Sequence, residues 1–61
     1  MAAPQVLMYS KAWCPYCQRA RTLLLSKSVS LEEVDIEAHP ERREEMIRRS
    51  GRRTVPQIFV G

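Results

Sequence analysis

Two cysteines carry the clearest chemistry in this sequence. Cys14 and Cys17 are separated only by a proline and a tyrosine. Two thiols three residues apart at the start of a helix lie within one turn, close enough to close a small disulfide ring. The pair predicts dithiol–disulfide exchange, in which one thiolate attacks a substrate disulfide and the second thiol resolves the mixed disulfide.

The two thiols are expected to differ in acidity. Pro15 suits the first position of a helix, which places Cys14 at the helix N-terminus, where free N–H groups and the helix dipole stabilise a thiolate. Lys11 adds a positive charge three residues upstream. Cys17 lies one turn into the helix on its apolar face, so we expect it to be buried and protonated. Cys14 is therefore the expected nucleophile and Cys17 the resolving thiol.

The same region admits other interpretations. A zinc site would need two further ligands, and the chain offers only His39 as a nitrogen donor. The cysteines could also be plain core residues, although they stand at a strand-to-helix junction. Trp13 and Tyr16 either cover a thin core or form a binding rim, and both remain open. His39 itself precedes a proline and is typical of a surface or capping residue.

The chain around the cysteines predicts a strand followed by a helix. Gln5 to Ser10 is a β-favouring run that suits a strand covered on both faces. The helix is expected over Pro15 to Lys27, because its apolar residues recur at intervals of three and four. Those residues are Cys17, Ala20, Leu23 and Leu24, with Arg21 among the residues that face water.

The second half of the chain predicts a strand, a helix and a strand. Leu31 to Glu37 alternates apolar and acidic residues, as in a half-buried strand. A helix begins near Pro40, carries acids toward its start and arginines toward its end, and stops at Gly51, which suits a C-terminal cap. Val55 to Val60 predicts a third strand, with Pro56 near its start.

The order β-α-β-α-β predicts an α/β fold. A strand, a helix and a strand within 37 residues imply a right-handed crossover between parallel strands. The direction of the third strand stays open. On the second helix, Glu45 and Arg49 are spaced for an ion pair four residues apart.

The length bounds the chain to one domain over residues 1–61. A protein of this mass buries only about 60% of its unfolded surface, so we expect marginal stability and support from a ligand or a second copy. No apolar run exceeds three residues, far below the ~20 that a membrane span needs. The first residues, Met1 to Pro4, do not resemble a signal peptide, which favours the cytoplasm and reduced thiols.

The net charge of +3 is unevenly distributed. All seven acids lie in residues 31–45, and four arginines follow in residues 46–61. A basic tail can indicate a nucleic-acid partner. Because the arginines directly follow the acids, the pattern favours one helix charged to suit its dipole, and we expect neither a nucleic acid nor a membrane as partner.

Two stretches together resemble the glutaredoxin family, in its small bacterial dithiol form. They are Lys11 to Cys17 (KAWCPYC) and Arg52 to Gly61 (RRTVPQIFVG). The resemblance implies a thioredoxin-like fold and an enzyme that reduces glutathione mixed disulfides and protein disulfides. It implies glutathione as the reducing co-substrate, no metal, and glutathionylated or disulfide-containing proteins as partners. It also implies that Val55–Pro56 is a cis peptide bond beside the dithiol.

The resemblance assigns roles to particular residues. Cys14 corresponds to the nucleophile and Cys17 to the resolving thiol. The implied glutathione-contacting set is Lys11, Tyr16, Thr54, Val55 and Pro56, with Lys11 near a carboxylate of the tripeptide. Arg43 matches a polar or basic position that can approach the glycine carboxylate of glutathione, and a solvated helix face is the alternative for it.

The resemblance also implies a last strand and a helix beyond Gly61, including an Asp-containing segment that holds the γ-glutamyl end of glutathione. This sequence ends at Gly61. We therefore expect a shortened domain with an uncovered sheet through which copies could associate. Two alternatives to the enzyme follow: a non-enzymatic assembly unit, and a dimer in which two Cys14 residues and two glutathiones hold a [2Fe-2S] cluster.

Overall fold

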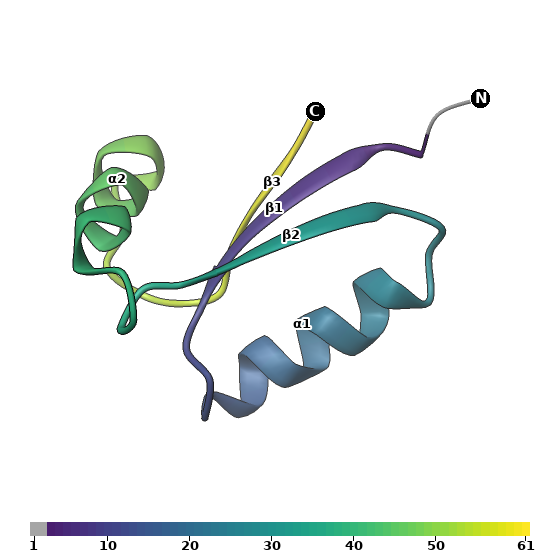
Figure 1. The fold of residues 1–61 in the computed structure, drawn as a ribbon, viewed down its shortest axis with the longest axis horizontal. Helices are drawn as coiled ribbons and strands as arrows, with labels where there is room; N and C mark the ends of the chain where they lie inside the picture. Colours follow the sequence, from purple (N-terminus) through teal and green to yellow (C-terminus); the bar gives the residue numbers. More distant parts are fainter. Residues whose placement is uncertain (1–2) are drawn as a thin grey trace.

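A computed structural model of the chain describes residues 3–61, which form three strands and two helices (Figure 1). The elements alternate in the predicted β-α-β-α-β order. Their bounds are β1 (Gln5–Ser10), α1 (Pro15–Leu25), β2 (Ser30–Asp35), α2 (Pro40–Ser50) and β3 (Gln57–Val60). The N-terminal prediction concerned Met1 to Pro4, of which residues 1 and 2 lie outside the described part.

The strands form one mixed sheet in the order β2-β1-β3. β1 and β2 are parallel, with Tyr9 opposite Val34, which confirms the predicted parallel pair. β3 runs antiparallel to β1, with Gln57 opposite Tyr9 and Val60 opposite Val6. The central strand β1 is therefore paired on both sides, and its residues from Val6 to Ser10 are buried or half-buried.

The two helices lie on opposite sides of the sheet (Figure 1). On the α2 side, Met46 packs with Tyr9, Val34 and Ile36 in the main hydrophobic cluster. On the α1 side, Val6, Met8 and Cys17 are buried. Because side chains alternate along β1, this one strand supplies apolar side chains to both layers.

Three predicted bounds are wrong by about two residues, and each has a local cause. α1 ends at Leu25 instead of Lys27, because Ser26 bonds back to the carbonyl of Leu23 through both its N–H and its hydroxyl. β2 ends at Asp35 instead of Glu37, because the Asp35 carboxylate accepts the backbone N–H groups of residues 37 and 38. β3 starts at Gln57 instead of Val55, after a cis Val55–Pro56 bond.

The helix α2 ends as predicted but uses different charge pairs. Gly51 caps it in the left-handed conformation, with φ +71°. Glu45 pairs with Arg42 at 2.9 Å, three residues away, instead of the expected Arg49. Arg49 donates to the hydroxyl of Tyr9 and lies over the ring of Phe59, 4.4 Å from its centroid.

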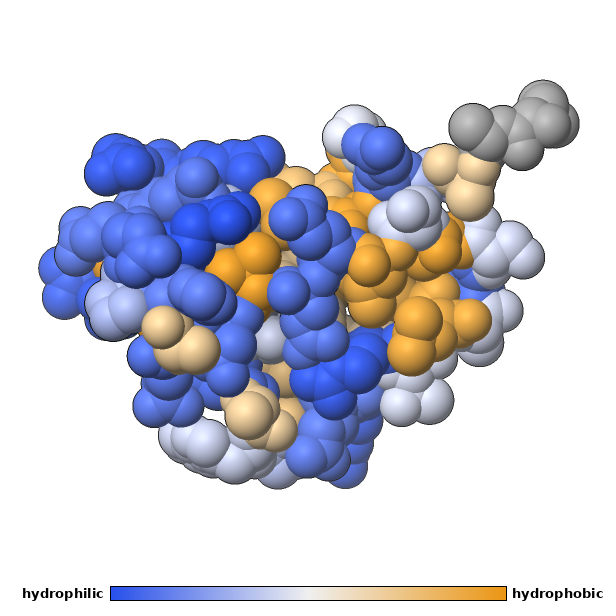
Figure 2. All heavy atoms as spheres, in the orientation of Figure 1, coloured by the Kyte–Doolittle hydropathy of each residue, from blue (hydrophilic) through white to orange (hydrophobic). Residues whose placement is uncertain are grey.

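Within the described residues, no helix is long and apolar enough to cross a membrane. The charged residues gather on α2, which is hydrophilic over most of its surface at the left of Figure 2. Apolar surface lies toward the right of the same view.

Candidate functional site

The dithiol lies where β1 passes into α1. Cys14 is the residue before α1, and its carbonyl accepts the N–H of Gln18 at 3.0 Å. Its own N–H donates to the carbonyl of Lys11 at 3.3 Å, which closes the loop that follows β1. Cys14 is 8% exposed, Cys17 is fully buried, and both are free thiols. The helix thus begins directly after Cys14, as the sequence predicts.

The surroundings of Cys14 favour its thiolate. A hydrogen bond from the backbone N–H of Cys17 is the largest effect that lowers the pKa of the Cys14 thiol. Desolvation opposes it, while the Cys17 side chain, the backbone N–H of Tyr16 and the charge of Lys11 lower the pKa further. The two backbone donors, of residues 16 and 17, are free N–H groups of the first helical turn.

The surroundings of Cys17 favour its neutral thiol. Burial raises the pKa of the Cys17 thiol, and a backbone hydrogen bond from Lys11 acts against this. The neighbouring Cys14 and the carboxylate of Glu33 raise the pKa further. The two thiols are therefore shifted in opposite directions, which is the difference that dithiol exchange needs.

Three residues close to the dithiol in the chain have side chains that reach the surface. Trp13 and Tyr16 are 67% and 68% exposed, so they do not cover the core. The indole N–H of Trp13 donates to Glu37 at 2.7 Å. The Lys11 ammonium lies over the Trp13 ring, 5.5 Å from its centroid. Lys11 and Tyr16 thus lie beside Cys14.

The segment Thr54 to Pro56 lies at the same end of the sheet. Gln57 pairs with Tyr9, and β3 is antiparallel to β1, so the residues just before Gln57 lie near the residues just after Tyr9. This pairing brings the segment to the edge where Lys11 and Cys14 lie. The Val55–Pro56 bond is cis, as predicted. Val55 packs against the main cluster, and the amide of Gln57 donates to the carbonyl of Thr54 at 2.9 Å.

Arg43 is not brought to the dithiol by any contact in the described part of the chain. It lies half-buried on α2, on the other side of the sheet from α1. His39 precedes α2, and its ring is 3.6 Å from Glu41, as suits a surface residue. Among residues 3–61, no three His, Cys, Asp or Glu side chains gather into a metal-binding group.

The sequence interpretation missed three residues next to Cys17. Arg21, expected to face water, makes an ion pair with Glu33 on β2. The hydroxyl of Ser10, at the end of β1, also donates to Glu33, at 2.7 Å. The spacing of four between Cys17 and Arg21 places both on one helix face and was the available signal.

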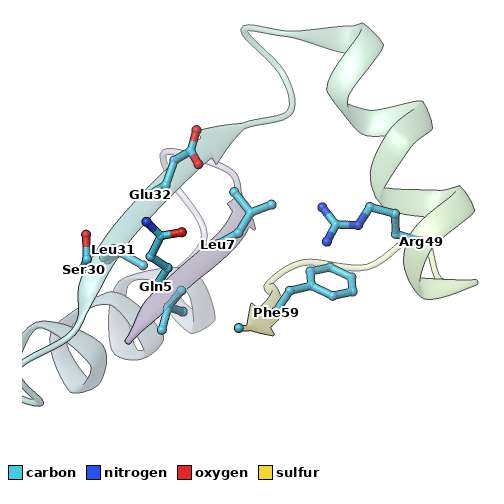
Figure 3. Close-up of a pocket in the computed structure, with 9 residues that line it drawn as sticks. Gln5, Leu7, Ser30, Leu31, Glu32, Arg49 and Phe59 are labelled. Atoms are coloured by element: carbon cyan, nitrogen blue, oxygen red, sulfur yellow. The ribbon is translucent and has the colours of Figure 1, made fainter. Parts of the chain in front are cut away.

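A separate pocket of about 320 Å³ lies away from the dithiol (Figure 3). Arg49 and Phe59 form one wall, and Leu7 and Glu32 lie opposite them. Gln5 also lines it, at the start of β1, whereas Cys14 follows the end of that strand. The pocket therefore belongs to the far end of the sheet and is not part of the dithiol site.

A buried strand that leads into a helix-capping Cys-x-x-Cys pair, opposite a cis-proline segment, defines the thioredoxin-like class of fold. The glutaredoxin family model matches residues 6–61. Glutaredoxin 3 of Escherichia coli (strain K12) is 58% identical over 55 residues, which cover 90% of this chain and 66% of that protein. The glutaredoxin of Pseudomonas aeruginosa is 48% identical over 58 residues, covering 95% of this chain and 69% of that protein. The chain belongs to the glutaredoxin family.

Solved structures agree with this fold. The glutaredoxin of Brucella melitensis has a TM-score of 0.73 and 47% identity, and the match covers 97% of this chain and 64% of that one. The holo form of glutaredoxin C1 from Populus tremula x tremuloides has a TM-score of 0.79 and 32% identity, covering 97% and 60%. The chain thus carries the β-α-β-α-β part of a thioredoxin-like fold and spans about two thirds of its relatives' length.

Proposed function

We propose that the chain is a glutathione-dependent thiol–disulfide oxidoreductase that acts through Cys14 and Cys17. The observation that carries this proposal is the opposite shift of the two thiols: the pKa of Cys14 is lowered and that of Cys17 is raised. An acidic thiol at the start of the helix, 8% exposed, followed by a fully buried neutral thiol suits attack and then resolution.

In the proposed reaction, the Cys14 thiolate attacks the glutathionyl sulfur of a mixed disulfide. The disulfide bond breaks, and the substrate leaves as a thiolate that takes up a proton. A second glutathione then attacks the glutathionyl sulfur on Cys14 and leaves as oxidised glutathione. For a protein disulfide, the Cys14 thiolate attacks one of its sulfurs, and Cys17 then attacks the Cys14 sulfur, so that the substrate leaves as a dithiol and the Cys14–Cys17 disulfide closes. Two glutathiones reduce this internal disulfide and leave as oxidised glutathione.

The proposed glutathione site comprises the residues that lie at the dithiol end of the sheet. Lys11 supplies a positive charge for a carboxylate, and Tyr16 supplies an exposed ring beside Cys14. The resemblance to glutaredoxins assigns the backbone of Val55, in the segment with Thr54 and Pro56, to pairing with the cysteinyl backbone of glutathione. Arg43 remains in the set on the resemblance alone. No metal is required for this chemistry, and a reducing compartment such as the cytoplasm would keep both thiols reduced.

The test compares Cys14→Ser with Cys17→Ser in an assay that follows the release of glutathione from a glutathionylated peptide. We expect Cys14→Ser to abolish turnover, because no acidic nucleophile remains. Cys17→Ser should retain turnover of the mixed disulfide and lose reduction of protein disulfides. Equal residual activity of the two variants on the mixed disulfide would contradict the assigned roles.

A second proposed role is self-association through the sheet. It is favoured by Ile58 and Val60 on the edge strand β3, which are 41% and 73% exposed. Unpaired edges of a sheet are templates for pairing with another chain. A light-scattering mass that stays monomeric at all concentrations would contradict this role.

A further inference from the structure

One carboxylate on β2 bonds to the strand before the dithiol and to the helix after it. Glu33 accepts a hydrogen bond from the Arg21 Nε of α1 through Oε1, at 2.6 Å, and a second one from Arg21 Nη2 through Oε2. The same Oε2 accepts the hydroxyl of Ser10, the last residue of β1, at 2.7 Å. Ser10 is only 1% exposed. The cluster Ser10–Arg21–Glu33 therefore links β1, α1 and β2 on the α1 side of the sheet.

This cluster lies next to the resolving thiol. Arg21 follows Cys17 by four residues and shares its helix face. Glu33 is opposite Met8 in the register of β1 and β2, so its side chain shares a sheet face with Met8 and with Ser10. Three charged or titratable side chains act on Cys17: Cys14 before the helix, Arg21 on α1 and Glu33 on β2. Glu33 is the one fixed negative charge among them.

Both members of the ion pair stay charged while the thiols titrate. The hydrogen bonds from Arg21, and then that from Ser10, hold the pKa of the Glu33 carboxyl below its usual range, although partial burial opposes them. Arg21 is positive at every pH of interest. A negative Glu33 disfavours a thiolate at Cys17, and a positive Arg21 favours one. Glu33 and Arg21 therefore have opposite effects on the ionisation of the Cys17 thiol.

Building on the proposed roles of Cys14 and Cys17, we propose that Glu33 is a positioning residue that slows resolution: its charge delays the attack of Cys17 on a mixed disulfide at Cys14, and Arg21 moderates the delay. In the affected step, the Cys17 thiol loses its proton and its sulfur bonds to the Cys14 sulfur. The bond from Cys14 to the bound thiol breaks, and that thiol leaves with the electron pair and takes up a proton. The delay gives a free thiol time to resolve the mixed disulfide instead.

The test uses 5,5′-dithiobis(2-nitrobenzoate), mixed rapidly with one equivalent of the reduced chain. Attack by Cys14 releases one coloured thiolate in a first phase, and attack by Cys17 releases the second in a later phase. A tenfold easier ionisation of Cys17 speeds its attack about three-fold, because a less basic thiolate is also a weaker nucleophile. We expect the second phase to be about three-fold faster in Glu33→Gln and slower by a similar factor in Arg21→Met.

Charge-matched controls separate this effect from a change in net charge. Glu32→Gln removes the same charge from the other face of β2, where Glu32 lines the pocket of Figure 3. Arg19→Met removes a cation from an exposed position of α1. Both controls should leave the second phase within experimental error of the unmodified chain. The pH at which the second phase is half-maximal should fall in Glu33→Gln and rise in Arg21→Met.

Each outcome is decisive. If the cluster only held α1 on the sheet, Glu33→Gln and Arg21→Met would both slow the second phase, and that result would overturn the proposal. An unchanged second phase in both variants would also overturn it. If Glu33→Gln fails to fold, Arg21→Lys carries the test, because it retains the charge and should restore the rate lost in Arg21→Met. Absence of the first phase in the unmodified chain, or its persistence in Cys14→Ser, would contradict the thiol roles instead.

Discussion

At the scale of single residues, the difference between the two thiols follows from their places on one helical turn. Cys14 precedes the first turn and receives the free N–H groups of residues 16 and 17. Cys17 lies one turn later against the sheet, where it is fully buried. The same helix therefore stabilises a thiolate at one cysteine and a neutral thiol at the other.

The pKa of Cys14 gives a direct test at this scale. In a Cys17→Ser chain, the rate of alkylation of Cys14 by iodoacetamide should rise with pH with its midpoint below pH ~8.5, the ordinary pKa of a thiol. The reason is the hydrogen bonding of the thiolate by the first helical turn, helped by Lys11. A profile with its midpoint at or above the ordinary value would contradict this expectation.

The same lowered pKa has a consequence for stability. The folded chain holds the Cys14 proton less tightly than the unfolded chain, so the thiolate contributes stability that is fully present above the unfolded pKa. That contribution should be lost as the pH falls through the lowered, folded-state pKa. Urea unfolding of Cys17→Ser, compared with Cys14→Ser/Cys17→Ser over this pH range, measures it. A difference that grows as the pH falls would contradict the direction.

At the scale of elements, a buried tyrosine holds α2 on the sheet. The hydroxyl of Tyr9 donates to Glu45 at 2.5 Å and accepts from Arg49 at 3.0 Å, so it bonds to two residues of one helix. Tyr9 is fully buried, and the guanidinium of Arg42 lies over its ring at 5.9 Å. These hydrogen bonds depend on direction, whereas the apolar packing of Met46 against the sheet does not.

Replacing Tyr9 tests this contact. Tyr9→Phe keeps the ring and removes the hydroxyl, and we expect a loss of about 1–2 kcal/mol in the free energy of unfolding, because the hydroxyl bonds to charged partners. The midpoint of urea unfolding measures the loss. Tyr16→Phe is the matched control: its ring is 68% exposed, so its unfolding midpoint should stay unchanged. Equal midpoints for both variants would contradict the role of Tyr9.

The end of α2 gives a second test at the element scale. Gly51 has φ +71°, and its N–H donates to the carbonyl of Ile47 at 2.8 Å. No neighbouring atom lies within 4 Å of the position that a Cβ would take, so the cost of a substitution is the backbone strain of the positive φ and not a steric clash. Gly51→Ala should lower the free energy of unfolding by roughly 1–2 kcal/mol, and Gly51→Asn by less. Thermal unfolding that does not distinguish the three chains would contradict this explanation.

At the scale of the whole molecule, the sheet has two open edges in the described residues, because β1 alone is paired on both sides. Large apolar side chains are exposed on β3 and on α1, and Figure 2 shows apolar surface over part of one face. A thin core with open edges favours association, because pairing buries both the edge and the apolar surface.

A change at the edge tests this expectation. Val60 is 73% exposed near the end of β3. The light-scattering mass of the chain should rise with concentration, and Val60→Lys should reduce the rise, because a lysine on an edge strand opposes pairing. Thr54→Lys adds the same charge outside the strands and should leave the association unchanged. A mass that responds equally to both variants would exclude β3 as the contact.

The sequence by itself determined what depends on neighbouring residues. The Cys-x-x-Cys spacing, the proline after Cys14 and the apolar periodicity predicted the five elements, their order, the parallel pair and the difference between the thiols. The elements and the difference between the thiols arise within single turns and strands, so they can be seen in short stretches of sequence. The parallel pair follows from the order of the elements, because a strand-helix-strand crossover is almost always right-handed. The resemblance further predicted the cis bond before Pro56, which the structure contains.

Tertiary structure alone decided which distant residues meet. The antiparallel direction of β3 depends on how the chain returns after α2, and it is this pairing that brings the segment before Gln57 to the dithiol end. Arg21 and Glu33 are 12 residues apart, and Ser10 and Glu33 are 23 apart. Their contacts depend on the register of β1 against β2 and on how α1 packs over both strands. Local periodicity contains neither, so the position of the Glu33 charge near Cys17 could be found only from the folded chain.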